Sequence, residues 1–319
     1  MFRKLIILTA TFLIGTLSVM AQKPEKATLA VMPFGFSRGF QTVIRGQQGT
    51  QLNLTRQVID SEFSNELIGF LTKSRKFTIL ERQNIDKIID ENNLTYSEWV
   101  KPGEEQRIGK LLLADYLVIG TINRLEFVVK AIPLKLTGRT EYRYIMTFKL
   151  QFRVVKVSSG QIVYADTLIK KLTSTDVRRE IPATIRKDWT MGDYKDLLFK
   201  KTTVEVGNAI LESVFPVKIA AIDGKTVTLN RGKGAGITVG TTYKVYAQGK
   251  AVIDPDTGDV LGSSETEVGI IQVSSVLPKF SKGLIVKKEG DIKIGSICRP
   301  LKKAGVSEAP AYPRATPGW

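Results

Sequence analysis

The side chains that could carry out chemistry are few in this sequence. It contains no histidine and a single cysteine, Cys298. Without histidine the chain cannot build a Ser-His-Asp or Cys-His catalytic group, or an imidazole-based zinc or iron site. One cysteine excludes an internal disulfide and a cysteine-rich metal site. Carboxylates remain the only ordinary acid–base pair, and the sequence singles out none. We therefore predict a protein that is not an enzyme and that has no catalytic residue, metal or cofactor.

One set of carboxylates has the spacing of a calcium loop. Asp254, Asp256 and Glu265 match positions 1, 3 and 12 of the EF-hand template. Gly258 and Asp259, however, are interchanged relative to the residues required at positions 5 and 6, and no helical patterns flank the stretch. We predict a β-turn, in which proline fixes φ and glycine accepts a positive φ, with calcium binding as the alternative.

Two glycine-rich stretches resemble phosphate-binding loops. Residues 35–51 lack the Lys and Ser/Thr of a P-loop and the tight spacing of a dinucleotide fingerprint, so we predict a flexible connector. The second stretch contains Gly232, Gly234 and Gly236. It is predicted to be a turn between strands.

Residues 1–21 have the three parts of a secretory signal peptide. Arg3 and Lys4 precede an apolar core, and Val19-Met20-Ala21 follows with small residues at the positions that a signal peptidase reads. The apolar core is shorter than the roughly 20 residues that span a bilayer, so cleavage after Ala21 is favoured over a retained anchor. We expect an exported chain in the periplasm or at the periplasmic face of the outer membrane.

Positive charge is concentrated in the middle of the chain. The formal net charge is +16, and residues 127–203 hold 16 Lys and Arg against 7 Asp and Glu. In a cytoplasmic protein this excess favours nucleic acid. For an exported chain we expect no nucleic acid but acidic envelope polymers or anionic lipid head groups, with a solvated basic face as the alternative.

The elements that must position these groups begin with an α/β layer. Phe77–Leu80 and Tyr116–Ile122 are apolar runs typical of strands. Between them, apolar residues recur twice at helical spacing: Ile85, Ile88 and Ile89, then Ile108, Leu111 and Leu112. Residues 27–34 predict an earlier strand and residues 54–73 a helix. The predicted order is β, α, β, α, α, β, with the helices lying on the sheet.

Four segments of this layer resemble the successive blocks of a known family. LAVMPF, FTILERQNIDKIIDEN, IGKLLLADYLVIGTI and FRVVKVSSGQIVYA are similar to the CsgG family, named for the curli secretion channel, over about residues 27–215. The amino-terminal domain of TolB and the activators of penicillin-binding proteins share that core. The resemblance implies an α+β fold with a CsgG-like domain at 22–215.

The same resemblance implies a function. It indicates a non-enzymatic factor for assembly or secretion in the cell envelope, forming a homo-oligomeric scaffold or ring at the outer membrane with other envelope proteins as partners. The alternative is a soluble periplasmic regulator that binds and activates an envelope partner, as the penicillin-binding-protein activators do.

The most informative strand pattern lies at 141–154, where apolar and polar residues alternate and only Ile145 breaks the rule. Soluble strands usually have five or six residues, whereas a membrane-crossing strand needs roughly 9 to 11. With 125–136 as its partner it predicts a long hairpin, and in the CsgG channel the first membrane hairpin lies here. We predict that six residues face lipid or another subunit: Tyr142, Tyr144, Met146, Phe148, Leu150 and Phe152. The alternative is that this face packs on the domain's own helices.

A second membrane hairpin would fall at 170–201, where the sequence departs from the CsgG pattern. Charges occur on both faces of this segment. A lipid-facing Arg or Lys costs about 2 to 4 kcal/mol at mid-membrane. This polar segment therefore disfavours a pore.

The rest of the chain predicts a second domain and a tail. Thr203–Phe215 reads as a closing helix, and short apolar runs with glycine-rich turns follow to Leu301, predicting a small β-barrel or sandwich at 216–301. The run GKGAGITVGTTYKVY resembles the carboxy-terminal domain of the flagellar T protein, a periplasmic ring component. Residues 302–319, rich in proline, are predicted to be disordered.

Overall fold

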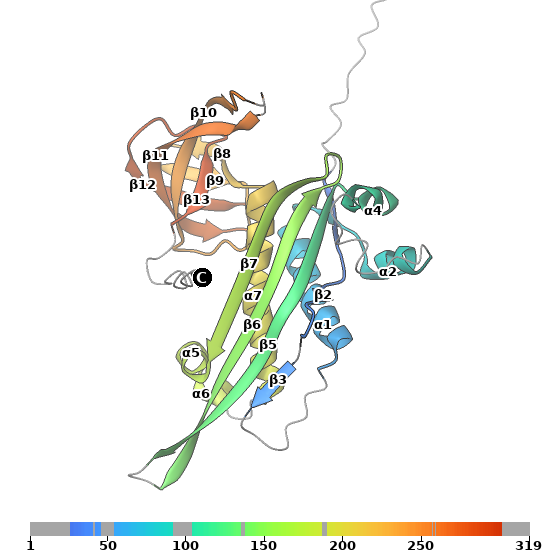
Figure 1. The fold of residues 1–319 in the computed structure, drawn as a ribbon. Coiled ribbons are helices and arrows are strands. Elements are labelled where there is room, and N and C mark those ends of the chain that lie inside the picture. Colours follow the sequence, from blue (N-terminus) through green and yellow to red (C-terminus); the bar gives the residue numbers. More distant parts are fainter. Residues whose placement is uncertain are drawn as a thin grey trace, which may run out of the picture.

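The structure is a computed structural model that describes residues 26–40, 42–45, 54–91, 104–134, 138–186, 190–256, 258 and 260–301. The predicted signal peptide and carboxy-terminal tail lie outside these residues. The described chain has the predicted α+β fold, in which a helix-covered sheet is followed by a separate small barrel of strands (Figure 1).

The sheet of the first domain has seven strands. Its main order is β4-β1-β5-β6-β7, and β2 and β3 pair with β5. β1 runs parallel to β4 and β5, whereas β5, β6 and β7 form an antiparallel meander. The strands are β1 (Thr28–Val31), β2 (Gly35–Phe36), β3 (Thr42–Arg45), β4 (Thr78–Ile79), β5 (Tyr116–Leu134), β6 (Arg139–Lys156) and β7 (Gln161–Thr173).

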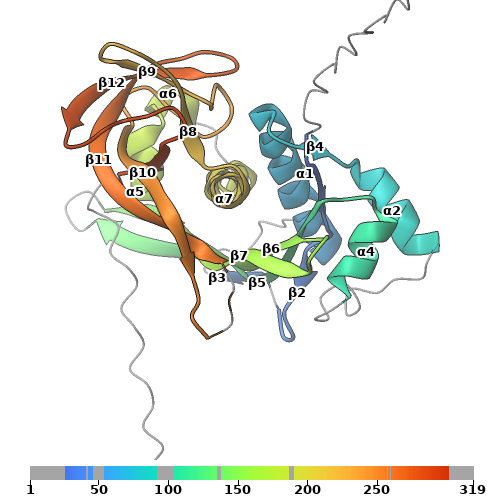
Figure 2. The same ribbon diagram turned by 90° about the horizontal axis from the view of Figure 1, so that it is seen from above.

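Helices cover both faces of this sheet, but to different extents. The long helices α1 (Arg56–Ser74) and α7 (Met191–Val214) bury their apolar sides on one face. α2 (Arg82–Glu91) and α4 (Glu105–Leu111) pack on the other face, over β1 and the first residues of β5. In Figure 2, β1 and β4 run between α1 on one side and α2 and α4 on the other. Two short helices, α5 (Ser174–Glu180) and α6 (Ala183–Arg186), join β7 to α7.

Aromatic side chains hold the larger core together. The ring of Phe63 in α1 lies 5.2 Å from Phe34, 5.2 Å from Phe148 in β6 and 5.8 Å from Phe199 in α7. A Cβ atom on Gly120 of β5 would come within 2.0 Å of the Phe34 ring, so only glycine leaves room for that ring. Edge-to-face aromatic pairs of this kind add stability beyond the area that they bury.

The α/β order follows the prediction, and the differences come from long-range pairing. Two short strands, β2 and β3, occur within the segment predicted to be a flexible connector, because both find partners on β5. The runs 116–122 and 125–134 form one strand with a register shift at Asn123. The closing helix starts at Met191, not at Thr203, because Thr190 and Asp193 form a capping box there.

The second domain is a closed barrel with the order β10-β11-β12-β9-β8-β13. Its strands are β8 (Val217–Asp223), β9 (Thr226–Leu229), β10 (Thr242–Ile253), β11 (Val260–Val276), β12 (Ser281–Lys288) and β13 (Ile297–Pro300). Arg231, only 2% exposed, joins the barrel to α7. It donates to the Glu212 carboxylate and to the Phe215 carbonyl, both at 2.6 Å.

Candidate functional site: the β5–β6 hairpin and the open face of the sheet

β5 and β6 form a hairpin that is longer than its neighbours. The two strands pair from Tyr116 and Lys156 to Leu134 and Arg139. β3 accompanies β5 only as far as Val128, and β7 accompanies β6 only from Ile145. The residues beyond, 129–134 and 139–144, therefore project past the rest of the sheet, and we name them the hairpin tip (Figure 1).

Four of the six residues predicted to face lipid or another subunit lie in the core of the chain itself. Met146, Phe148, Leu150 and Phe152 are buried. The ring of Phe148 contacts those of Phe63 and Phe199, at 5.2 and 4.9 Å. These four residues therefore pack on the domain's own helices, as in the alternative, and do not face lipid or another subunit. The reason is that α7 begins twelve residues earlier than predicted and so covers this face.

The other two residues lie nearer the hairpin tip, where helix cover ends. Tyr144 is half-buried and stacks on Tyr194 of α7, with ring centroids 5.2 Å apart. Tyr142 is 50% exposed. Of the predicted set, Tyr142 alone presents a largely accessible apolar surface.

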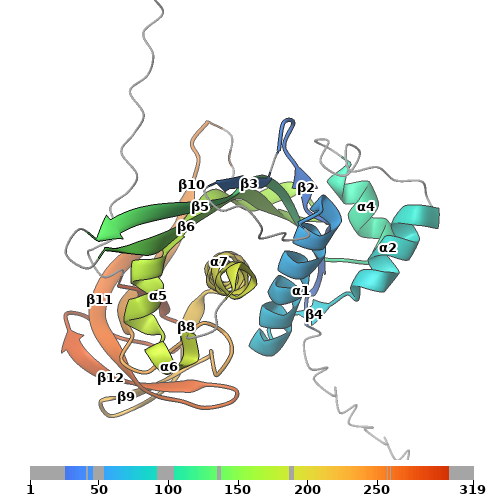
Figure 3. The ribbon, with the colours of Figure 1, turned by 90° about the horizontal axis from the view of Figure 1, so that it is seen from below.

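The opposite face of β5, β6 and β7 carries polar side chains. Beyond α4 no described helix covers this face (Figure 3). We call this surface the open face. The strand register arranges it in rungs: Thr121, Gln151 and Thr167 lie side by side, then Arg124, Lys149 and Ile169, and further along Lys130 lies opposite Arg143. The alternation that buries Phe148 and Leu150 inside places Lys149 and Gln151 outside.

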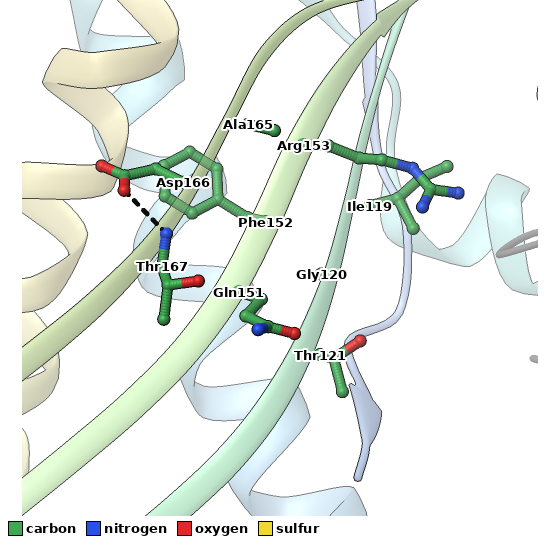
Figure 4. A pocket seen from close by; sticks show the side chains of 9 residues that line it. All are labelled: Ile119, Gly120, Thr121, Gln151, Phe152, Arg153, Ala165, Asp166 and Thr167. Carbon is green, nitrogen blue, oxygen red and sulfur yellow. Dashed lines mark hydrogen bonds between the residues drawn. The ribbon is translucent and has the colours of Figure 1, made fainter. Parts of the chain in front are cut away.

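A cavity of about 350 Å³ is present at the covered end of the open face. Its outward-facing lining has two rungs, one of Ile119, Arg153 and Ala165 and one of Thr121, Gln151 and Thr167. Figure 4 shows the side chains of Gln151, Thr121 and Thr167 on adjacent strands. At one end, the guanidinium group of Arg153 donates to the Glu105 carboxylate of α4 at 2.8 Å. The cavity therefore offers hydroxyl and amide groups beside a cation that is already paired.

The Tyr164 hydroxyl in β7 and the Cys298 thiol in the barrel both have raised pKa values. The Tyr164 hydroxyl donates to Asp166 at 3.0 Å, and burial together with this carboxylate raises the pKa of Tyr164 to about 12. Burial likewise raises the pKa of the Cys298 thiol in the barrel to about 12, so its reactive thiolate form is scarce at neutral pH.

The predicted calcium-type carboxylates are not brought together. Asp254 accepts a hydrogen bond from the Asp256 amide at 2.8 Å within the turn between β10 and β11, where Gly258 has φ of 73°. Glu265 lies in β11 and pairs with Arg299 at 2.8 Å. Within the described ranges no group of three or more acidic, cysteine or histidine side chains could hold a metal ion. The segment forms the predicted turn.

The cations of the open face and the neutral polar residues beside them are what sequence reasoning missed as a group. The alternation in 141–153 already assigned Arg143, Lys149 and Gln151 to a polar face. Their neighbours Arg124, Lys130 and Thr167 belong to other strands, and only the register brings them alongside. A search for alternating apolar and polar residues in 119–132 and 161–173 would have found these side chains as candidates for a polar face. It would not have shown which of them lie opposite one another.

Comparison with known proteins identifies a family for the first domain. The family model described as "Curli production assembly/transport component CsgG" matches residues 17–205. No curated protein matches the chain. Among the residues that the structure describes, no helix has both the length and the apolar character needed to cross a bilayer.

Several solved structures are distantly similar. The LpoB C-terminal domain from Salmonella enterica is 14% identical with a TM-score of 0.29, and the match covers 46% of this chain and 85% of that one. The hypothetical protein CT253 from Chlamydia trachomatis is 16% identical with a TM-score of 0.34, covering 58% and 98%. A PelC dodecamer from Paraburkholderia phytofirmans is 10% identical with a TM-score of 0.27, covering 55% and 85%. Likenesses this weak carry no functional conclusion.

Proposed function

The chain belongs to the CsgG family, and from this premise we propose that it is an exported, non-enzymatic assembly or secretion factor that forms a homo-oligomeric scaffold at the outer membrane. Membership makes it an envelope-associated factor. The family match ends at residue 205 and does not extend to the barrel, so the likeness of residues 216–301 to the flagellar T domain remains a hypothesis.

The observation that carries the proposal is the hairpin tip. Beyond Val128 and before Ile145 the outer edges of β5 and β6 have no strand partner in the described chain. Unpaired strand edges are ready sites for a strand of another chain. The tip also exposes Leu134 (40%) and Tyr142 (50%). Backbone pairing along the edges and burial of these two side chains together favour contact between neighbouring copies.

The hairpin tip is too short to cross a bilayer by itself, which favours a scaffold over a pore. Six residues of extended strand reach roughly 20 Å, less than the hydrocarbon core of about 30 Å. Met146, Phe148, Leu150 and Phe152, which follow on the same strand, are buried in the core of the chain itself. The geometry therefore supports contact at a membrane surface or between subunits rather than a crossing by this hairpin alone.

The first prediction tests the proposal through Tyr142. Native membrane fractionation followed by size measurement should find the wild-type protein in a large, membrane-held species. Tyr142→Glu places a charge on the hairpin tip and should shift the protein to a small soluble species with an unchanged melting temperature, because this side chain is half exposed and lies outside the core. Val239→Glu is the matched control, since Val239 lies on the barrel and is 63% exposed.

A wild-type protein that is monomeric and soluble would refute the scaffold and favour the soluble periplasmic regulator. One observation supports that second candidate. The apolar face of β6 is covered by α1 and α7, so the long strand needs neither a membrane nor a second copy to bury it. Capture of an envelope partner by the monomer would then be the expected activity.

A further inference from the structure

The open face combines unbalanced positive charge with neutral hydrogen-bonding groups. Arg124 lies directly opposite Lys149, and Lys130 directly opposite Arg143, so two like-charge pairs face each other across β5 and β6. Like charges at directly opposed positions destabilise a sheet. A fold that keeps two such pairs on one exposed surface gains from an anion that binds between them.

Carboxylates of the chain itself compensate these cations only in part. Arg124 approaches Glu126 at 3.9 Å, and Arg143 approaches Glu141 at 3.6 Å, although Glu141 is shared with Arg178 of α5. Within the described chain, Lys130 and Lys149 have neither an ion pair nor a side-chain hydrogen bond. Each opposed pair therefore retains one ammonium group for an external anion.

The cavity beside the first cation pair, Arg124 and Lys149, indicates which kind of anionic ligand fits this face. The rung of Thr121, Gln151 and Thr167 precedes the rung of Arg124 and Lys149, a step of roughly 7 Å along the strands. The second pair, Lys130 and Arg143, lies roughly 20 Å further on. Hydroxyl and amide groups match the hydroxyl groups of a sugar, and ammonium and guanidinium groups match carboxylates.

We propose that the open face binds an acidic polysaccharide, with one sugar ring in the cavity against Gln151 and with carboxylates of the same chain at the two cation pairs. An elongated track of charge fits a linear polymer. An anionic lipid surface would need positive charge but would make no specific use of the Thr and Gln side chains that line the cavity. The inference concerns a different surface from the hairpin tip and stands independently of the proposed scaffold.

The test measures binding of polygalacturonate, a linear uronic acid polymer, to the full chain by calorimetry, with neutral dextran as the uncharged comparison. The double variant Arg124→Gln/Lys149→Gln should weaken binding about tenfold or more, because it removes two charge-assisted contacts. Its melting temperature should not fall, because an unfavourable like-charge pair is removed. Lys225→Gln/Lys250→Gln, which removes two exposed charges from the barrel, should leave binding unchanged.

Gln151→Ala separates recognition of a sugar from simple attraction between charges. It should weaken binding about threefold to tenfold at constant salt, because a neutral hydrogen-bonding group is lost while every charge is kept. Equal weakening by the barrel variant, or no effect of Gln151→Ala, would overturn the proposal. Binding to phosphatidylglycerol-containing vesicles without binding to polygalacturonate would also overturn it, in favour of a lipid surface.

Discussion

Phe148 is buried inside the protein, although the strand pattern predicts that it faces lipid or another subunit. It is fully buried, between Phe63 of α1 and Phe199 of α7. Phe148→Ala should lower the free energy of unfolding by about 3–5 kcal/mol, the usual cost of the lost burial and of the cavity left behind. Denaturant unfolding of the purified chain measures this change.

Thr147→Ala is the adjacent control for this prediction. Thr147 lies on the open face, is half-buried, and forms no part of the aromatic core. Its replacement should change the free energy of unfolding by no more than about 0.5 kcal/mol. If Phe148→Ala proved as stable as wild type, then this face of β6 would not be buried as described.

At the scale of the element, the start of α7 depends on a capping box. The Thr190 hydroxyl donates to the Asp193 carboxylate at 2.7 Å, and the Thr190 amide donates to the same oxygen at 2.6 Å. The Asp193 amide in turn donates to the Thr190 hydroxyl at 3.4 Å. These bonds occupy donors that have no partner within the helix, and they start α7 early enough to cover the hairpin.

Removing this cap should have a pH-dependent cost. Asp193→Ala should lower the free energy of unfolding by about 1 kcal/mol at neutral pH. The Thr190 hydroxyl and amide hold the pKa of Asp193 below its ordinary value of 3.8, so the folded protein binds this proton more weakly than the unfolded chain. The stabilisation is therefore complete above that ordinary value and is lost as the pH falls through the lower folded pKa.

The corresponding measurement is thermal unfolding of wild type and Asp193→Ala at neutral pH and at several values below pH 4. The gap between the two proteins should narrow as the pH falls. Asp223→Ala, an exposed carboxylate at the end of β8, should show no comparable gap at any pH. A gap for Asp193→Ala that stayed constant with pH would show that the carboxylate does not stabilise α7 through its charge.

At the scale of the whole molecule, the barrel has a core of its own. Twelve buried residues from five of its strands and its loops form one cluster, and the strands close without an unpaired edge in the sheet order. A fragment of residues 216–301 should therefore fold alone and unfold cooperatively. Circular dichroism with thermal melting checks this, and a gradual, featureless melt would contradict it.

The isolated barrel should nevertheless be less stable than the barrel in the full chain. Arg231 is buried, and in the fragment it loses both the Glu212 carboxylate and the Phe215 carbonyl. A buried cation without its partners is costly. Arg231→Met in the fragment should recover part of the lost melting temperature, because methionine fills a similar volume without a charge. The same substitution in the full chain should destabilise it.

The sequence by itself determined the features that depend on local periodicity and composition. Period-two alternation marked the two faces of β6, helical spacing located α1, α2 and α4, and the absence of histidine removed the common catalytic groups. The family blocks and the α/β order could also be predicted, because each is carried by a short continuous stretch.

The tertiary structure decided which element covers which face. The sequence of β6 alone does not predict that α7, more than forty residues later, buries Phe148. Nor does it predict that Lys149 lies opposite Arg124 and next to the rung that contains Gln151. Register and layer packing join residues distant in the chain, so burial and charge pairing become defined only when the sheet has formed.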